Sequence, residues 1–451
     1  MLGKTVATKP ALTPAQAIVL GFAFAILGGA VALWMPFSVR SGHFNNFIDA
    51  LFTSTTAVCV TGLVTVDTGS FYNNIGHAIV LFLIQIGGLG IITATTMYAL
   101  ISGKRIGLRE RILIKESLNR ESLGGVVRLV RAIVITTVII EGTGAALLFF
   151  FLRGEGVPPL KALWWGAFHS ISAFCNAGID LFGKDYAPYC SLIPFQNNEG
   201  ILLTIALLII FGGIGFIVLL KMMQVKNWRK LSVHAKLALT ATGILLALGT
   251  IFFYFTESGN TFAHMGLSER LTNAFFMSVT PRTAGYAAVD FGKVIPSSLL
   301  MIMILMFIGA APGGTGGGIK VTTFSVLVLA VWARMRNRED IELFDRRLDK
   351  GIVYNALTVI TLAGTVVIAC VMLLTLVDPH DPIKLMFEAF SAFGTVGLTT
   401  GITPELTDGA KLILIFLMFF GRLGPLTMAF ALMEKTKTNN IKYPKGTVMI
   451  G

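Results

Sequence analysis

Four short segments of this 451-residue chain resemble one another, and each ends in a glycine. Two of them share Ser-Ala-Phe with a glycine four residues after the Phe, and the four glycines lie 107 to 116 residues apart. A ring of backbone carbonyls replaces the water shell of a cation without burying a fixed charge, and glycine allows the turns that such a ring requires. The pattern therefore predicts a cation filter; four helix caps in a repeat-built transporter of another kind are the alternative. The predicted filter residues are Thr61, Gly62, Ala177, Gly178, Ala284, Gly285, Val396 and Gly397.

Acidic residues follow three of these glycines closely. Asp67 and Asp290 each come five residues after their glycine, and Asp180 comes two residues after its own. Glu405 follows the fourth glycine at a distance of eight. Such acids would form a loose outer ring that concentrates cations. Ordinary loop acids are an equally weighted alternative.

A glycine-rich run interrupts the apolar stretch 299–332. Residues 309–318 read Gly-Ala-Ala-Pro-Gly-Gly-Thr-Gly-Gly-Gly, and inside a helix each glycine costs about 1 kcal/mol and a proline about 3 kcal/mol. The helix must therefore break at membrane depth, where irregular backbone survives only beside a cavity or against protein. The run is not a phosphate-binding loop, because Ile319 separates Gly318 from Lys320 and no strand precedes it.

A basic residue stands in the corresponding place of the fourth repeat, in Gly421-Arg422-Leu423-Gly424-Pro425. A charge within the membrane is costly and usually functional. Our hypothesis is that Arg422 holds the glycine-rich run through its carbonyls and raises an electrostatic barrier to cations. A salt bridge that serves only folding is the alternative. Lys320 either acts in the same way or reaches the cytoplasmic edge of the membrane.

Two further charged residues, Arg282 and Glu141, and two glycine-rich runs also need an interpretation. Arg282 is expected to brace the third turn, with Glu388 as one candidate partner, and Glu141 has no partner that the sequence names. The runs 86–90 and 211–215, both with the pattern Gly-Gly-x-Gly, are poor dinucleotide fingerprints. We interpret them as small residues that allow helices to pack closely.

The elements that position these residues follow from the composition. Of all residues, 54% are hydrophobic and 13% are charged, about half of the roughly 25% usual in a soluble domain. A bilayer core about 30 Å thick needs roughly 20 apolar residues of helix. Eight stretches qualify, namely 15–37, 75–101, 130–152, 201–223, 237–256, 299–332, 352–376 and 412–433. Four shorter ones lie between them and suit re-entrant helices, namely 45–59, 160–175, 271–280 and 384–394.

The basic residues that give the chain its net charge of +12 are concentrated in a few segments. Twenty-five of the 36 basic residues lie in the two tails and in the segments 102–131, 221–236 and 333–350, together with nine acids. Positive charge marks the cytoplasmic side, so both termini are predicted to be cytoplasmic. These segments are topology signals and show no sign of nucleic-acid binding.

The sequence therefore predicts an all-α polytopic membrane protein, built from four tandem repeats of span, re-entrant helix, glycine turn and span around one pseudo-fourfold pore. The predicted divisions are a cytoplasmic tail at 1–14, repeat one at 15–125, repeat two at 126–230, repeat three at 231–345 with an intramembrane loop at 309–318, repeat four at 346–433 and a cytoplasmic tail at 434–451.

The four glycine turns, the segments 280–285 (TPRTAG) and 391–399 (SAFGTVGLT), and the glycine-rich run together resemble the Ktr/Trk/HKT superfamily of potassium transporters. The resemblance covers essentially the whole chain. The first repeat begins near Ala15, whereas Trk members usually carry extra N-terminal spans, so the resemblance is to the Ktr type. It implies potassium uptake through a filter at Gly62, Gly178, Gly285 and Gly397.

The same resemblance implies how the pathway is controlled. The run 310–318 would be a movable gate under the filter, with Gly313, Gly314, Thr315, Gly316, Gly317, Gly318 and Arg422 as its residues. The protein would be a homodimer with one pore per subunit in a bacterial inner membrane. A cytosolic ring of nucleotide-binding RCK subunits would regulate it, and 334–350 is the segment that looks most like a docking element for that ring.

The sequence favours potassium as the transported ion but does not exclude sodium. All four filter positions are glycine, whereas some plant relatives with sodium preference carry serine at the first, so potassium is favoured as the transported ion. Sodium stimulation stays open, and a sodium-selective or unselective cation channel of the same fold is the alternative function. No covalent cofactor, transition metal or enzymatic activity is expected, because the four cysteines and six histidines show no ligand spacing. A membrane-embedded enzyme would need convergent acids and bases, where the repeats supply glycines.

Overall fold

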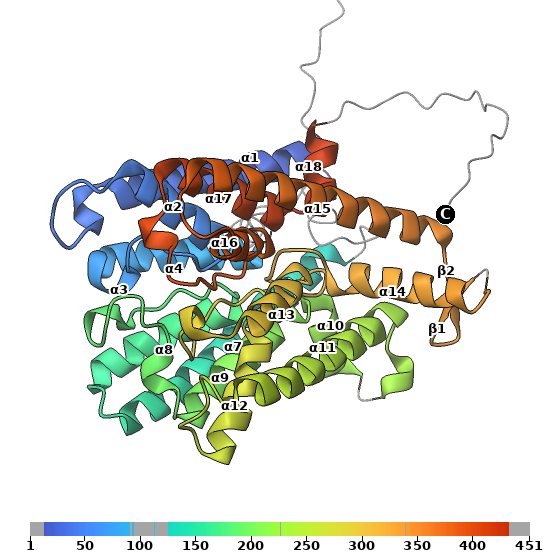
Figure 1. Cartoon of the computed structure of the whole chain (residues 1–451), viewed down its shortest axis with the longest axis horizontal. Helices are drawn as coiled ribbons and strands as arrows, with labels where there is room; N and C mark the ends of the chain where they lie inside the picture. Colours follow the sequence, from blue (N-terminus) through green and yellow to red (C-terminus); the bar gives the residue numbers. More distant parts are fainter. Residues whose placement is uncertain are drawn as a thin grey trace, which may run out of the picture.

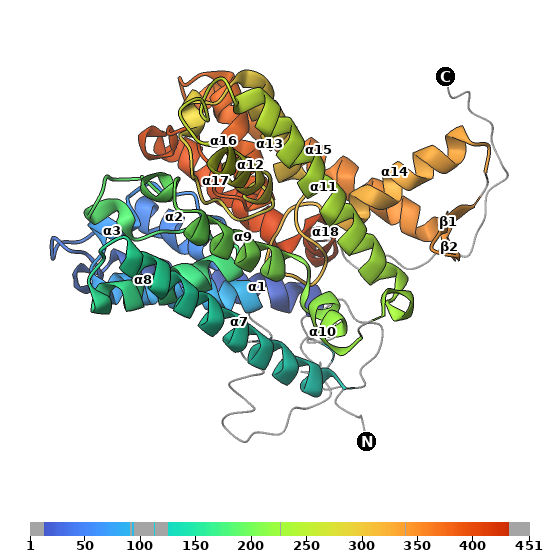
Figure 2. The same ribbon diagram turned by 90° about the horizontal axis from the view of Figure 1, so that it is seen from below.

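The computed structural model describes residues 13–90, 93, 112, 125–225, 227–338 and 340–432. Within these residues the regular structure is helical except for one antiparallel hairpin, β1 (Ile341–Leu343) with β2 (Arg346–Leu348). The hairpin and the helix before it, α14 (Val321–Met335), extend away from the main body, as Figure 2 shows. The predicted tail 434–451, most of the tail 1–14 and most of the basic segment 102–131 lie outside the described residues.

Each repeat opens with one long helix, and these four helices are long and apolar enough to cross a membrane. Each leaves a large apolar side chain at least 71% exposed, namely Phe24, Phe150, Phe255 and Leu376. Side chains of this kind on the outside of long apolar helices fit contact with lipid. The helices are α1 (Pro14–Trp34), α7 (Val126–Gly154), α11 (Val233–Glu257) and α15 (Lys350–Val377).

A shorter helix follows in each repeat, close to the ranges that the sequence predicted as re-entrant. The four are α2 (Phe47–Val58), α8 (Pro159–Phe174), α12 (Leu267–Val279) and α16 (Pro382–Gly394). Polar residues begin two of them: the side chain of Asn46 accepts from the amide of Ile48, and that of Asp381 accepts from the amide of Ile383. Each helix ends directly before its predicted filter segment. We call these four the pore helices.

The second spans of repeats two, three and four are each divided into two helices, and in repeat one the described helix ends at Leu89. The helices are α4 (Asn74–Leu89), α9 (Glu199–Gly213) with α10 (Phe216–Gln224), α13 (Pro296–Phe307) with α14, and α17 (Asp408–Leu423) with α18 (Pro425–Leu432). The sequence predicted the break in repeat three and identified residues 421–425 as its counterpart in repeat four, but it did not predict the break in repeat two. In repeat two α9 and α10 meet at a bend of 101°. Gly90, Gly215 and Gly424 end or interrupt these helices with φ of 84°, 97° and 83°, a region that glycine adopts at little cost.

The glycines before these breaks allow close packing, as the sequence suggested for the runs 86–90 and 211–215. A methyl group on Gly87 would meet the backbone carbonyl of Val58, and one on Gly212 would meet that of Phe174. Gly421 faces the carbonyl of Phe393 in the same way. The three carbonyls belong to the last turns of pore helices, so in repeats one, two and four the second helix lies directly against the end of its own pore helix.

The repeats close into a ring. The helix after each filter segment packs against the pore helix of the next repeat, in the pairs α4 with α8, α9 with α12 and α13 with α16. The last pair, α17 with α2, joins the end of the chain to its beginning, and these helices lie side by side in Figure 1. A largely buried ion pair at 2.9 Å between Lys411 Nζ on α17 and Asp49 Oδ1 on α2 reinforces that closure.

Alanine at Gly87 tests the close packing. Because the added methyl group would press on backbone atoms of Val58, Gly87→Ala should destabilise the fold by about 1–3 kcal/mol and lower the yield of monodisperse protein. Gly142→Ala is the matched control, since no atom lies within 4 Å of its added methyl group. Thermal unfolding of the purified proteins in detergent measures the difference, and equal stability of the two variants would contradict the packing role.

Candidate ion pathway

The structure brings the four predicted glycine turns together in one ring. Gly62, Gly178, Gly285 and Gly397 have φ between 64° and 99°. A side chain on each glycine would meet the backbone carbonyl that precedes the glycine of the next repeat, and the contact of Gly397 with Thr61 completes the circuit. The other three carbonyls belong to Ala177, Ala284 and Val396. Glycine is required both by its φ and by this close approach of neighbouring backbones.

Each turn holds a second left-handed residue two positions before the glycine. Val60, Asn176, Thr283 and Thr395 have φ between 49° and 69°, which is uncommon for residues with a side chain and a marked outlier for β-branched ones. Strained backbone of this kind is concentrated at functional sites, where the surroundings hold it in place. The same strain at the same position in all four repeats indicates a backbone shape that the site requires.

Hydroxyl groups at the ends of the pore helices hold this backbone, a feature that the sequence reasoning missed. Thr56 Oγ1 accepts from the amide of Gly62 at 2.9 Å, and Ser391 Oγ accepts from that of Gly397 at 3.0 Å. Ser172 Oγ accepts from the amide of Ile179 at 3.1 Å. In repeat three, Thr280 Oγ1 donates to the carbonyl of Tyr286 at 2.6 Å. The signal was a hydroxyl residue six positions before the filter glycine in three of the four repeats, namely Thr56, Ser172 and Ser391.

A cavity of about 120 Å³ lies against one side of the ring. Its lining includes all four glycines together with residues that follow them in sequence. Of the predicted outer acids, Asp67 and Asp180 line it and Asp290 does not. Asp290 instead caps a short turn by accepting from the amide of Gly292, and it lies 3.4 Å from Lys293 Nζ. The acids at this cavity therefore come from repeats one and two.

The glycine loop, residues 309–320, lies on the opposite side of the turns. Gly316 packs on Thr283 and Gly317 packs on Thr395, so the loop touches residues that precede the glycines. Thr395 Oγ1 accepts from the amide of Gly317 at 3.0 Å. The fully buried Thr315 donates through Oγ1 to Asn176 Oδ1 at 3.0 Å. The loop is thus bonded to repeats two and four directly beneath the ring.

Backbone hydrogen bonds attach the loop further to the broken second helices. The carbonyl of Gly212 accepts from the amide of Thr315 at 3.1 Å, and the carbonyl of Gly213 accepts from that of Ala311 at 2.9 Å. In repeat four the carbonyl of Gly421 accepts from the amide of Gly318 at 3.3 Å. These carbonyls are free for the loop because their helices end or break nearby.

Arg422 lies where the hypothesis placed it. Its guanidinium donates to the carbonyl of Thr315 in the loop and to the carbonyl of Gly87 in repeat one, with Gly88 O at 3.5 Å. Within the described residues no carboxylate forms an ion pair with it. The neighbouring Lys320 donates through Nζ to the carbonyl of Gly316 at 2.7 Å. Both bases therefore bind the loop through its carbonyls.

Two other charged residues, Arg282 and Glu141, have partners that the sequence did not predict. Arg282 donates to the carbonyl and the hydroxyl of Thr242 on α11, at 3.2 and 3.1 Å, so the candidate partner Glu388 is not its partner. Glu141 on α7 accepts from Gln85 Nε2 at 3.4 Å. These contacts join helices that are distant in sequence, and no local pattern signals them.

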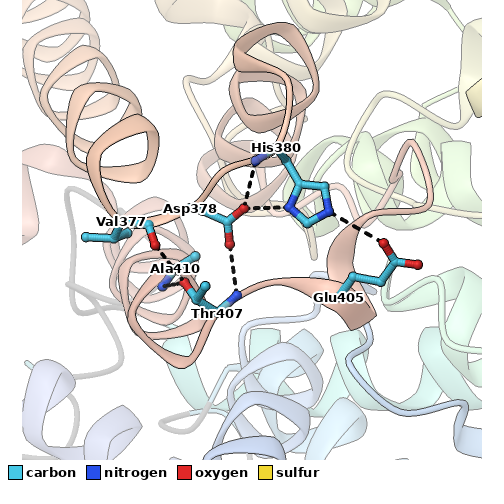
Figure 3. A network of polar contacts seen from close by, with 6 residues as sticks. All are labelled: Val377, Asp378, His380, Glu405, Thr407 and Ala410. Atoms are coloured by element: carbon cyan, nitrogen blue, oxygen red, sulfur yellow. Dashed lines mark hydrogen bonds and ion pairs between the residues drawn. The ribbon is translucent and has the colours of Figure 1, made fainter.

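A separate polar network lies beyond the end of α15, shown in Figure 3. The two ring nitrogens of His380 face carboxylates, with Nδ1 at 2.5 Å from Asp378 Oδ1 and Nε2 at 3.5 Å from Glu405 Oε2. Asp378 also accepts from the amide of Thr407 at 2.8 Å. The hydrogen bond to Asp378 raises the pKa of His380 above its ordinary 6.5. Glu405 thus belongs to this network and is absent from the cavity lining.

Comparison with known proteins shows to which family this chain is similar. The model of the TrkH cation transport protein family matches residues 15–441. The potassium/sodium uptake protein NtpJ of Enterococcus hirae is 40% identical over 98% of both chains. The Ktr system potassium uptake protein B of Bacillus subtilis is 39% identical over 97% of both chains. The crystal structure of the potassium transporter TrkH from Vibrio parahaemolyticus has a TM-score of 0.74 at 18% identity, over 96% of this chain and 87% of that one.

The fold and the site define an all-α, multi-pass membrane transport protein, and the chain is not an enzyme. The chain belongs to the TrkH family of cation transport proteins, and its full-length similarity places it with the Ktr type of that family.

Replacing His380 with glutamine tests the network of Figure 3. Because the pKa of His380 is raised in the folded protein, the stability that protonation contributes is complete below pH 6.5 and is lost as the pH rises through the raised pKa. The melting temperature of the wild type should therefore exceed that of His380→Gln by more at about pH 5.5 than at about pH 9. His264→Gln, at an exposed histidine, is the control. A difference that does not change with pH would contradict the assignment.

Proposed function

We propose that this chain takes up potassium across a bacterial inner membrane through the ring of carbonyls at Thr61, Ala177, Ala284 and Val396. The observation that carries the proposal is the closed circuit in which each filter glycine faces the carbonyl of the next repeat. Such a ring offers a dehydrated cation oxygen atoms from four sides without a fixed negative charge. The four pore helices also end beside the ring, and the partial negative charge of a helix C-terminus favours a cation.

The cavity on one side of the ring and the glycine loop on the other define the proposed route of uptake. A cation enters the cavity beside Asp67 and Asp180, exchanges water for carbonyl oxygens at the ring, and meets the glycine loop beneath it. The membrane potential drives this movement, with about 2.3 kcal/mol per charge for each 100 mV. Since each repeat supplies only one filter glycine, we expect weaker discrimination between ions than in a potassium channel whose filter loop carries two.

The loop and Arg422 form the gate in this proposal. The loop occupies the inner side of the ring, and the guanidinium adds a positive charge there that opposes cation passage. Hydrogen bonds to backbone carbonyls hold the loop, and each contributes only about 0.5–1.5 kcal/mol net, so the loop can be released without moving a whole helix.

Regulation would come from outside this chain. We propose a homodimer with one pore per subunit, cytoplasmic termini and a cytosolic RCK-type nucleotide-binding ring as partner. The mixed-charge hairpin β1–β2 and the end of α14 support the docking role of 334–350, because they project from the body. Exposed charges lie on the hairpin, as at Arg347, and in the connection to α14, as at Arg338. The relatives that match over their full length include a subunit of a named Ktr system, which supports a multi-component assembly.

A cation channel that is sodium-selective or unselective is the second candidate. The name of the Enterococcus hirae relative includes both potassium and sodium. Backbone oxygens such as those of the ring coordinate either ion. Ion competition in cells that lack their own potassium uptake separates the candidates. Potassium uptake that resists excess sodium supports the first, and equal competition supports the second.

Serine at Gly285 or Gly397 tests the filter. A side chain there would press on the carbonyl of Val396 or Thr61 and distort the ring, so the sodium concentration that halves tracer uptake should fall about tenfold, or about 1.4 kcal/mol of discrimination. Gly243→Ser, where no atom lies within 4 Å, controls for the substitution itself. Undiminished potassium selectivity in both filter variants would remove these glycines from the filter.

Shortening the loop tests the gate. Deletion of residues 313–317 removes the segment beneath the ring together with the carbonyl that Arg422 holds, and potassium flux should rise. Arg422→Gln should change the transport rate more than the amount of protein in the membrane, whereas the exposed Arg131→Gln on α7 should change neither. Unchanged flux in the deletion variant would exclude the loop as the gate.

A further inference from the structure

One position on the pore helices differs between repeats in a way that the proposed function leaves unexplained. It is the ninth residue before each filter glycine, where the four repeats carry Thr53, His169, Phe276 and Glu388. All four side chains are buried, and two of them are groups that proteins rarely bury without partners. The question is what His169 and Glu388 bind.

Glu388 on α16 binds the segment that follows the filter glycine of repeat four. Its Oε1 accepts from the amide of Thr400 at 3.1 Å and from the hydroxyl of Thr399 at 2.6 Å. Its Oε2 accepts from the hydroxyl of Thr403 at 2.8 Å. Thr400 is the third residue after Gly397, and Thr399 lines the outer cavity. The carboxyl therefore joins the pore helix to the outer edge of the ring.

His169 on α8 makes the equivalent contact in repeat two. Its Nδ1 lies 2.7 Å from the carbonyl of Trp165, so this nitrogen carries the proton and donates. The other nitrogen, Nε2, then accepts from the amide of Leu181 at 3.3 Å. Leu181 is the third residue after Gly178, the same offset as Thr400 from Gly397. The ring of Phe182 stacks on the imidazole at 4.1 Å and keeps its orientation.

Repeats one and three have no such contact. The hydroxyl of Thr53 donates to the carbonyl of Asp49 on its own helix, and Phe276 has no polar group. Because the repeats follow one another around the ring, repeats two and four stand opposite each other. Pore-helix side chains therefore hold the outer edge of the ring only in repeats two and four. In repeats one and three the loop of repeat two does so, because Tyr189 Oη donates to the carbonyl of Thr65 at 3.3 Å and Ser191 Oγ accepts from the amide of Ala287 at 3.0 Å.

We propose that His169 and Glu388 are positioning residues that hold the outer edge of the ring open and thereby favour potassium over the smaller sodium ion. The inference rests on the proposed function of the ring as an ion filter. A ring that discriminates by size or by the number of its oxygens needs its backbone kept from closing around the smaller ion. Both contacts are buried, where a lost acceptor leaves an amide without a partner and the segment free to shift.

The test compares tracer rubidium uptake in potassium-uptake-deficient cells that express the full chain with its regulatory partner. The readout is the sodium concentration that halves uptake, normalised to protein in the membrane. His169→Ala and Glu388→Ala should lower it about tenfold, while His169→Gln and Glu388→Gln, which keep an acceptor oxygen, should restore most of it. Ser170→Ala is the matched control, because Ser170 is equally buried on α8 and its hydroxyl donates to the carbonyl of Glu141, away from the ring.

A second variant keeps the proposal open to refutation if an alanine variant fails to reach the membrane. Thr403→Val removes one donor to Glu388 from the far side of the contact with little change in shape, and should lower the sodium tolerance about threefold. Unchanged tolerance in this variant, or in alanine variants that reach the membrane, overturns the role of the two residues. If Gly285→Ser lowers the tolerance and these variants do not, the inference alone fails; if none of them does, the filter itself is wrong.

Discussion

The close approach of four glycine turns is the contact on which the rest of the structure depends. Each glycine lies against the carbonyl of the next repeat, and no side chain fits between them. The ring forms only if all four pore helices end at the same depth and point toward one axis. The packing of each second helix on the neighbouring pore helix and the Lys411–Asp49 pair between the last repeat and the first serve that requirement.

The same geometry determines where positive charge can be placed. A guanidinium within a membrane needs acceptors, and Arg422 finds them in the carbonyls of Thr315 and Gly87, near helix ends and in irregular backbone. Broken helices therefore have two roles here. They free carbonyls that bind the glycine loop and the arginine, and they leave room beneath the ring for the loop itself.

Fourfold similarity of the scaffold does not extend to the polar groups around it. The acids at the cavity come from repeats one and two, and the glycine loop comes from repeat three. Repeat four supplies Arg422 and the network around His380. A repeated backbone with different side chains at equivalent positions lets one chain combine four similar walls with several distinct roles, which an assembly of four identical chains does not allow.

The sequence by itself determined the class of fold, the ranges of the pore helices and the glycine turns, because hydrophobic length and glycine spacing are local properties that the backbone must obey. It also placed the break at residues 309–318. It did not predict the break at Gly215, since the glycines of 211–215 are equally compatible with close packing of a continuous helix until the tertiary contacts decide. Only the tertiary structure decided the partners of Arg282 and Glu388 and the contact of Arg422 with Gly87, and excluded Asp290 from the cavity, because these contacts join segments up to 335 residues apart and depend on how four repeats close around one axis.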